Sequence, residues 1–385
     1  MNPKILLSTP HMGGNELKFI QKAFTDNWVA PLGANVNGFE SDLEEYLGNG
    51  SHVAVMSAGT AALHLALVML NIGAGDEVFC QSMTFAASAN PIAYVGARPV
   101  FIDSEKETWN MCPEALREAL ESRAKSGRLP KAVIVVHLYG MPAKMDELTA
   151  LCEEYNVPLL EDAAEALGST YKGVKCGTFG KMAILSFNGN KIITTSGGGA
   201  LVTKDQALKK KCIFLSTQAR DAAAHYEHSQ IGYNYRLSNI SAGIGRGQME
   251  VLDERVAARR RNQAFYSELF KDVDGIEVFT EPNDDFFSNH WLTSILVDPA
   301  KAGFTREDMR LKLLNRGIES RPLWKPMHMQ PVFQGSDFFG SGVSEELFRD
   351  GLCMPSGSNL GPEEHERIAE GVQCLVPNAA WSPTA

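Results

Sequence analysis

Residues 53–71 of this 385-residue chain read VAVMSAGTAALHLALVMLN, and this stretch indicates the fold. The apolar run Val53–Met56 predicts a short buried strand, and the small residues Ser57–Gly59 predict a tight turn. The apolar-rich stretch from Thr60 to about Asn71 then predicts a helix. A strand that leads through a tight turn into a helix is the repeating unit of a parallel α/β sheet.

The same unit recurs along the chain as far as Phe187. Further strands are expected at Glu77–Cys80, Pro99–Ile102, Ala132–Val136, Val157–Leu160 and Ile184–Phe187, and helices at Ala86–Tyr94, Pro113–Arg123 and Lys144–Tyr155. This alternation favours an α/β fold with a mostly parallel central sheet.

The C-terminal part of the sequence follows a different pattern. One long polar helix is predicted from Ser238, its N-cap, to about Val273. A strand is then expected at Trp291–Val297, and helices at Arg306–Asn315, Ser344–Gly351 and Pro362–Leu375. We therefore expect a large domain at residues 1–250 and a smaller C-terminal α+β domain at residues 251–385.

Composition excludes several classes of protein. Apolar residues make up 44% of the chain and charged residues 21%, which is typical of a soluble globular protein. The formal net charge of −10 argues against nucleic-acid binding. No apolar run is long enough for a membrane helix or a signal peptide, so we expect a cytoplasmic protein that does not bind a membrane.

Cysteines and histidines give no metal or disulfide signal. The seven cysteines are scattered and form no CxxC pair, which is typical of reduced thiols. His225 and His228 in HYEH have no Cys or third His near them in the sequence, so we expect no metal site.

The strongest chemical signal is SFNGNKIITTSGGGA, residues 186–200. A predicted strand ends at Phe187, the turn Asn188–Asn190 follows, and Lys191 comes directly after it. In open α/β sheets, ligands bind beyond the carboxyl ends of the strands. Lys191 is therefore well placed for covalent chemistry, although a lysine in a turn is more often a solvated surface residue.

A second signal is VPLLEDAAEALGS, residues 157–169, which places Glu161 and Asp162 at the end of another strand. A carboxylate there could face a protonated ring nitrogen, as the cofactor pyridoxal 5′-phosphate (PLP) requires. Taken alone, such an aspartate is about as often a helix N-cap.

The turn at Ser57–Gly59 supplies a third signal. Backbone N–H groups at the start of the helix near Thr60 form an anion cradle, to which Ser186 could add a hydroxyl donor. A plain N-cap would explain the same residues. Phe85 follows another strand end and could stack on a cofactor ring, although burial in the core is the commoner fate of phenylalanine.

Together these residues resemble the DegT/DnrJ/EryC1/StrS family of PLP-dependent sugar aminotransferases. The resemblance rests on the segments SAGTAALHLAL, MTFAASANPI, PVFIDSE, VVHLYGMPAKMDEL, EDAAEALGS, SFNGNKIITTSGGG and GYNYRLSNI. It implies the fold type I architecture of PLP-dependent transferases, related to aspartate aminotransferase.

The resemblance also implies roles for single residues. Lys191 would be the catalytic lysine that binds PLP covalently, and Asp162 would face the pyridine nitrogen. Asn234, in GYNYRLSN, matches an asparagine that reaches the phosphate from the neighbouring subunit, which implies a homodimer with shared active sites. The remaining implied cofactor-binding residues are Ser57, Gly59, Thr60, Phe85, Glu165, Ser186 and Asn188.

A narrower likeness is to the aminotransferases of UDP-bacillosamine synthesis, carried by segments such as TPHMGGNELKFI and RPLWKPMHMQPVF. It implies that UDP-2-acetamido-2,6-dideoxy-4-keto-glucose is the amino acceptor and L-glutamate the donor. Glu165 stands where many family members have Gln or His, and the bacillosamine-type enzymes are similar in this respect. The residues expected to contact substrate are Thr9, His11, Met12, Pro31, Leu32, Arg321, Trp324, Lys325 and His328.

Other functions stay open at this point. The enzyme could instead act on a dTDP sugar or a 3-keto sugar. Only the likeness to the bacillosamine subgroup separates these alternatives from the UDP-linked acceptor. Lys191 argues against a PLP-dependent sugar dehydratase, because such enzymes carry histidine at the matching position. A catalytically silent sugar-nucleotide-binding protein would be expected to have lost Lys191 or Asp162. A nicotinamide oxidoreductase is disfavoured because no G-x-G-x-x-G opens a helix after a strand.

Overall fold

The structure, a computed structural model, describes residues 4–376 and 379. Its centre is a mostly parallel eight-stranded sheet. The strand order is β1 (His52–Met56), β9 (Gly199–Thr203), β8 (Met182–Ser186), β5 (Leu159–Asp162), β4 (Ala132–Val136), β2 (Glu77–Gln81), β3 (Arg98–Ile102) and β14 (Phe338–Phe339). Only β9 runs against its neighbours, which confirms the predicted α/β class.

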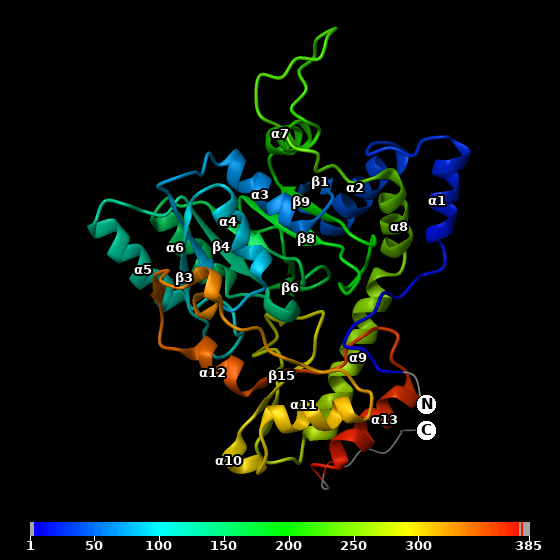
Figure 1. The fold of residues 1–385 in the computed structure, drawn as a ribbon, viewed down its shortest axis with the longest axis vertical. Coiled ribbons are helices and arrows are strands. Elements are labelled where there is room, and N and C mark those ends of the chain that lie inside the picture. Colours follow the sequence, from blue (N-terminus) through cyan, green and yellow to red (C-terminus); the bar gives the residue numbers. More distant parts are fainter. Residues whose placement is uncertain (1–3, 377–378, 380–385) are drawn as a thin grey trace.

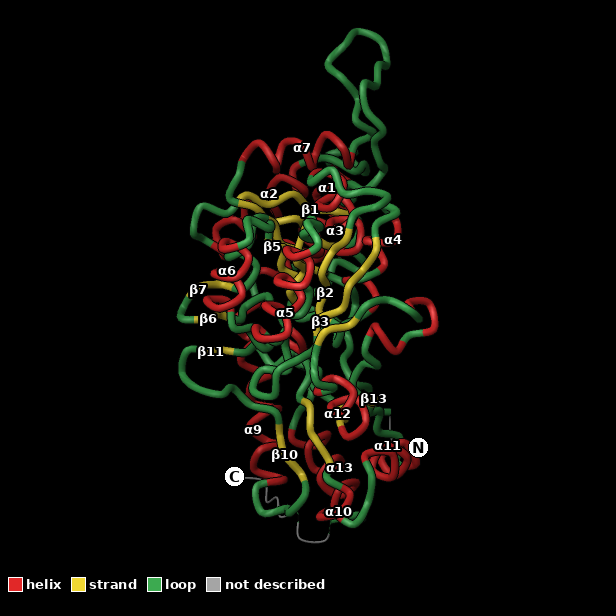
Figure 2. Tube along the Cα trace, turned by 90° about the vertical axis from the view of Figure 1, so that its left-hand side faces the viewer, coloured by secondary structure: helices red, strands yellow, loops and turns green. Residues whose placement is uncertain are grey.

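Helices flank this sheet on both sides (Figures 1 and 2). They are α2 (Ala34–Leu47), α3 (Gly59–Met69), α4 (Asn90–Tyr94), α5 (Pro113–Lys125), α6 (Met145–Glu154) and α7 (Gln206–Ser216). The helix α1 (Glu16–Thr25) packs on α8 (Asn239–Met249). Successive residues of one strand enter opposite cores, because side chains alternate across a sheet. Phe79 packs with Val133 on one face, and Val78 packs with Ile134 on the other.

A second sheet lies at the opposite end of the molecule. Its antiparallel strands are β10 (Ile276–Val278), β12 (Ser294–Val297), β15 (Gly351–Cys353) and β13 (Arg321–Pro322). The helices α10 (Pro299–Ala302), α11 (Arg306–Asn315), α12 (Val343–Asp350) and α13 (Pro362–Gln373) surround it (Figure 1). A small sheet of β11 (Phe286–Phe287), β6 (Thr170–Tyr171) and β7 (Val174–Lys175) lies at the edge of the molecule (Figure 2).

The two ends of the molecule are linked by several chain segments. α9 (Leu252–Phe270) carries the chain from the large sheet to the small one (Figure 1). The edge strand β14 returns to pair with β3, and Ile5 bridges to Ile318 beside the small sheet. We propose a division into domains near residue 250, with these two segments crossing between them.

The prediction of a single helix from Ser238 to Val273 is wrong, because the chain forms two helices there. α8 (Asn239–Met249) ends before α9 begins, and Val251 between them has φ −120° and ψ 9°. Ser238 is the N-cap, as predicted, since its side chain accepts the N–H of Ser241. Glycines let α8 pack tightly on other helices: a Cβ at Gly247 would lie 2.7 Å from the backbone nitrogen of Glu16 on α1.

The predicted helix Ala86–Tyr94 is a short 3₁₀ turn, Ala86–Ser88, followed by α4. In the part of the chain that the structure describes, no helix is both long and apolar enough to cross a membrane.

Candidate active site

A cavity of about 530 Å³ opens beyond the carboxyl ends of β1, β5 and β8. Its lining brings together residues that are far apart in the sequence and that sequence analysis had singled out. Among them are Ser57, Gly59, Thr60, Phe85, Asp162, Glu165, Ser186, Asn188, Lys191, Arg321 and Trp324. Strand ends therefore converge on one site, as expected for an open α/β sheet.

Lys191 lies inside this cavity, and its side chain is only 11% exposed. A turn that follows β8 positions it, in which the Lys191 N–H donates to the Asn188 carbonyl at 2.9 Å. Its Nζ lies 3.3 Å from Oε1 of Glu165 and 4.0 Å from the centre of the Trp291 ring. The ammonium group is thus held between a carboxylate and an aromatic face.

Glu165 is buried beside Lys191 and titrates near neutrality. Burial raises its pKa to about 7, and the charge of Asp162 adds to this rise. Lys191 and the backbone N–H of Tyr139, which donates to Oε2 at 2.7 Å, act in the opposite direction. Glu165 can therefore hold or release a proton beside Lys191 at physiological pH.

Asp162 ends β5 with its carboxylate facing the same cavity. It is 8% exposed and accepts the Ser88 hydroxyl at 2.6 Å and the Ala164 N–H at 3.1 Å. Ser88 lies next to Thr84, whose hydroxyl is 2.6 Å away. These bonds fix the orientation of the carboxylate.

The start of α3 forms an anion cradle. None of the described side chains caps its first turn, so its N–H groups remain available to a ligand. β9 passes so close that a Cβ on Gly199 would lie 2.3 Å from the Gly59 nitrogen, which explains a glycine there. Ser186 stands directly across from this turn: a Cβ on Gly59 would lie 3.4 Å from that of Ser186.

Aromatic rings form one wall of the cavity. The Trp324 ring lies 5.6 Å from that of Phe85, 5.1 Å from that of Tyr139 and 6.1 Å from that of Trp291. Phe85 is 58% exposed, so its ring is available for stacking. Arg321 lies at the same wall and pairs with Glu319 at 2.6 Å.

Several predicted residues lie outside this cavity. They are Thr9, His11, Met12, Pro31, Leu32, Asn234, Lys325 and His328. Thr9 and His11 contact the segment at Ser358 and Asn359. The imidazole of His328 is bonded to Ser82 at 2.7 Å and to Glu345 at 3.2 Å, and it stacks on Phe338. In this chain His328 therefore links segments of the fold rather than facing the cavity.

Trp291, Ser88 and Tyr139 are site residues that sequence reasoning missed. Trp291 had been assigned to a predicted strand, but β12 begins only at Ser294. No local pattern identifies the partners of Lys191 or Asp162, because these contacts join distant parts of the chain. For Trp291, the one signal in the sequence is a lone tryptophan that precedes an apolar run.

The cavity offers a suitable residue for each chemical group of PLP: the phosphate, the ring nitrogen, the aldehyde and the ring face. The uncapped start of α3, with Thr60 and Ser186, suits a phosphate. Asp162 suits a protonated ring nitrogen, and Lys191 can reach an aldehyde. Phe85 offers a ring face to the pyridine.

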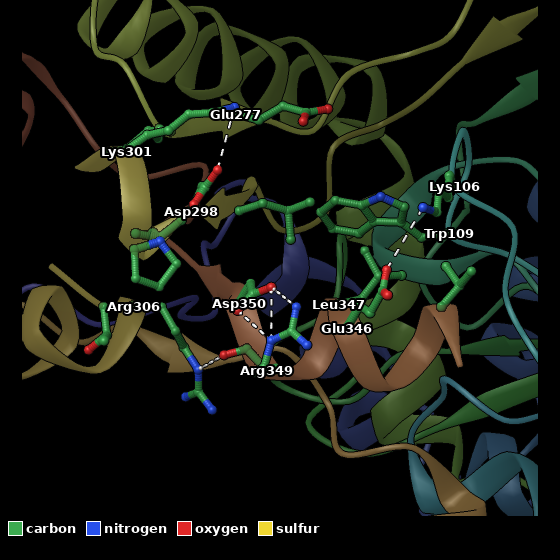
Figure 3. Close-up of a pocket in the computed structure, with 17 residues that line it drawn as sticks. Lys106, Trp109, Glu277, Asp298, Lys301, Arg306, Glu346, Leu347, Arg349 and Asp350 are labelled. Carbon is green, nitrogen blue, oxygen red and sulfur yellow. Dashed lines mark hydrogen bonds and ion pairs between the residues drawn. The ribbon is translucent and has the colours of Figure 1, made fainter. Parts of the chain in front are cut away.

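A larger depression of about 970 Å³ lies elsewhere, between the two ends of the molecule (Figure 3). Several of its charged groups are paired with one another, for example Lys301 with Asp298 at 3.4 Å and Arg349 with Asp350 at 2.6 Å. Arg306 donates to the Arg349 carbonyl. With these cations engaged and no cradle like that of α3, this depression is a weaker candidate than the Lys191 cavity.

Comparison with known proteins identifies the family. The sequence profile of the DegT/DnrJ/EryC1/StrS aminotransferase family matches residues 10–373. The pyridoxal phosphate-dependent aminotransferase EpsN of Bacillus subtilis is 53% identical over 96% of this chain and 95% of its own length. GDP-perosamine synthase of Escherichia coli O157:H7 is 35% identical over 94% of this chain and 96% of its own length.

Solved structures agree with the sequence comparisons. The crystal structure of a DegT/DnrJ/EryC1/StrS aminotransferase from Brucella abortus superposes with a TM-score of 0.85 at 32% identity, over 94% of this chain and 95% of that one. The fold is therefore the fold type I architecture that the family resemblance implied. The chain belongs to the DegT/DnrJ/EryC1/StrS aminotransferase family, and it is a PLP-dependent sugar aminotransferase.

Proposed function

We propose that this enzyme transfers the amino group of L-glutamate to C4 of UDP-2-acetamido-2,6-dideoxy-4-keto-glucose. The aminotransferase activity is supported by one observation: Lys191, Glu165 and Asp162 line the same cavity as the anion cradle at the start of α3. The choice of acceptor rests on the likeness of the N-terminal and RPLWKPMHMQPVF segments to the bacillosamine-type enzymes.

Bound PLP supplies an electron sink that stabilises negative charge at the carbon from which a proton is removed. Lys191 Nζ would hold the cofactor through its aldehyde. As a free amine, the same Nζ would take the proton from the substrate carbon that bears the nitrogen and return it on the other side of that nitrogen. Glu165 accepts a hydrogen bond from Lys191 and takes up or releases a proton near pH 7. The α3 turn, Ser186 and Thr60 would hold the phosphate, and Asp162 would face the ring nitrogen.

Arg321 and the Trp324 ring are proposed to bind the nucleotide part of the acceptor. A guanidinium suits a diphosphate, and an indole plane suits a nucleobase. Arg321 is 67% exposed and paired with Glu319, so it can exchange that partner for a phosphate at little cost. The donor and acceptor bind in turn, because the same Lys191 serves both halves of the reaction.

We also propose a homodimer in which a second copy completes each site. Asn234 lies at the base of a loop that extends away from the body beyond α7 (Figure 1). On this loop Tyr226 and Ile231 are 80% and 84% exposed, which is unusual for large apolar side chains. A partner subunit would cover them and bring Asn234 to the phosphate of the neighbouring site.

The nucleotide is tested by comparing acceptors. The purified enzyme would be given L-glutamate with UDP-, GDP- and dTDP-linked 4-keto-6-deoxy sugars, and kcat/KM would be measured for each. We expect the UDP-linked N-acetyl sugar to be preferred roughly 5- to 150-fold in kcat/KM, since a few nucleobase and acetamido contacts discriminate by about 1–3 kcal/mol. A preference for a GDP-linked sugar, as the name of the perosamine synthases suggests for those enzymes, would refute the proposed UDP-linked acceptor. It would not refute the aminotransferase activity.

A further inference from the structure

Arg259 lies in the middle of α9, behind the loop that carries Lys191. The residue is 1% exposed, and it is among the largest fully buried side chains of the described chain. Burial lowers the pKa of its guanidinium to about 9, and no described carboxylate forms an ion pair with it. Burying a charge without a counter-ion has a large desolvation cost in free energy. The groups that offset this cost are hydrogen-bond acceptors.

The guanidinium holds four different segments together. One terminal nitrogen donates to the carbonyls of Trp291 and Ser356, the latter at 3.1 Å. The other donates to the Ser8 hydroxyl at 2.9 Å and lies 3.4 Å from the Lys191 carbonyl. Arg259 thus joins the N-terminal segment, the Lys191 loop and two segments beside the small sheet.

Two of these partners themselves hold the Lys191 loop. The Ser8 hydroxyl donates to the Asn190 carbonyl at 2.8 Å, and the Trp291 indole N–H donates to the same carbonyl at 2.8 Å. The ring of Trp291 is therefore tied at its backbone to Arg259 and at its indole to the loop. That ring faces Lys191 Nζ.

We infer that Arg259 is a positioning residue for Lys191. It fixes the backbone of Asn190 and Lys191 and the indole of Trp291, and so it sets where Lys191 Nζ lies relative to Glu165. The inference rests on the proposed role of Lys191, and it concerns PLP binding and the half-reaction with L-glutamate, whatever the nucleotide of the acceptor. Small displacements of a catalytic group slow reactions strongly, so a loosened loop should be measurable.

The test variant is Arg259→Lys. A lysine keeps the positive charge. Its single ammonium group, however, lacks the planar fork of donors with which the guanidinium reaches acceptors in four segments. Two matched controls lie on the same helix. Arg260→Gln removes a partly exposed guanidinium that pairs with Glu281. Arg255→Gln removes a buried guanidinium that donates to the Met12 carbonyl and has no bond to the Lys191 loop.

Three quantities would be measured on the full-length protein. They are the dissociation constant of PLP, the rate constant of the half-reaction with L-glutamate, and the midpoint of thermal unfolding. For Arg259→Lys we expect PLP to bind roughly tenfold more weakly and the half-reaction to slow on the order of 10²-fold. Arg260→Gln should leave all three near wild type, and Arg255→Gln should lower only the unfolding midpoint.

Two results would overturn the inference. One is an Arg259→Lys protein that loses thermal stability as Arg255→Gln does, yet keeps wild-type PLP affinity and half-reaction rate. If Arg259→Lys does not fold, Ser8→Ala serves instead, since it removes one bond to Asn190 and one acceptor of Arg259. A wild-type rate and PLP affinity in Ser8→Ala would be the second overturning result.

A Lys191→Ala protein separates failure of this inference from failure of the proposed function. If Lys191→Ala still bound PLP covalently, the proposed role of Lys191 itself would be wrong. If Lys191→Ala lost that linkage while Arg259→Lys and Ser8→Ala behaved as wild type, only the role of Arg259 would be refuted.

Discussion

Glu165 and Lys191 form the buried ion pair at the centre of the site, with 3.3 Å between Oε1 and Nζ. Both follow strand ends, and that position was visible in the sequence because apolar runs stop just before them. What the sequence could not provide is the environment that gives Glu165 a pKa of about 7. Burial by distant segments, which leaves the residue 4% exposed, raises this pKa, whereas the N–H of Tyr139, a residue in the left-handed region at φ 54°, lowers it.

The raised pKa makes stability depend on the Glu165 proton. Because the folded state holds this proton more tightly than the unfolded state, its stabilising contribution is present below pH 4.5 and is lost as pH rises through about 7. Glu165→Gln cannot ionise. Its free energy of unfolding, relative to wild type, should therefore increase by roughly 2–3 kcal/mol between pH 5 and pH 8.

Urea denaturation of the cofactor-free proteins at both pH values measures this change. Parallel behaviour of wild type and variant across the range would show that Glu165 is ionised in both states, contrary to the prediction.

Elements with strong local signals were predicted well. β4 and α11 occupy the predicted residues, and α11 begins with a capping box at Thr305. Failures came where tertiary contacts decide. β9 was not foreseen, because its opening glycine reads as part of a loop until β1 and β8 are in place on either side. The break between α8 and α9 likewise has no periodicity signal, since the sequence is polar on both sides.

α12 depends on an aspartate from the large sheet. Asp103, just beyond β3, is 1% exposed, and its carboxylate accepts four backbone N–H groups at residues 341–344 and the Ser344 hydroxyl. Asp103→Asn turns one acceptor into a donor that faces these N–H groups. We expect the free energy of unfolding to fall by about 2–4 kcal/mol, because buried donors lose their partners.

The matched control is Asp205→Asn at the N-cap of α7, where an exposed carboxylate accepts one N–H, from Ala207. It should cost less than about 1 kcal/mol in the same urea experiment. Equal losses in the two variants would mean that Asp103 is an ordinary cap and not a link between the sheet and α12.

At the scale of the whole molecule, the alternation of strands and helices was enough to predict the α/β class and the edge of the sheet that carries the site. It did not place the substrate residues. Most of those expected by resemblance lie outside the cavity of one chain, and side chains such as Tyr226 and Ile231 remain exposed. The homodimer with shared sites that we propose would account for both observations.

Shared sites predict complementation between two inactive variants. Lys191→Ala removes a group from a subunit's own site, whereas Asn234→Ala removes one from its partner's site. A mixed dimer then contains one intact site. Random pairing of equal amounts should restore about a quarter of wild-type activity, because half the dimers are mixed and each has one working site.

The activity of co-refolded subunits, compared with each variant alone, measures this recovery. Full activity of Asn234→Ala alone, or no recovery on mixing, would argue against a site completed by the partner.

The covalent role of Lys191 is tested by locating the lysine to which the cofactor is attached. The enzyme would be reduced with sodium borohydride in the presence of PLP, digested, and its peptides identified by mass spectrometry. We expect one labelled peptide, carrying the reduced cofactor on Lys191, and no label in Lys191→Ala. Label on a different lysine, or equal labelling of Lys191→Ala, would contradict it.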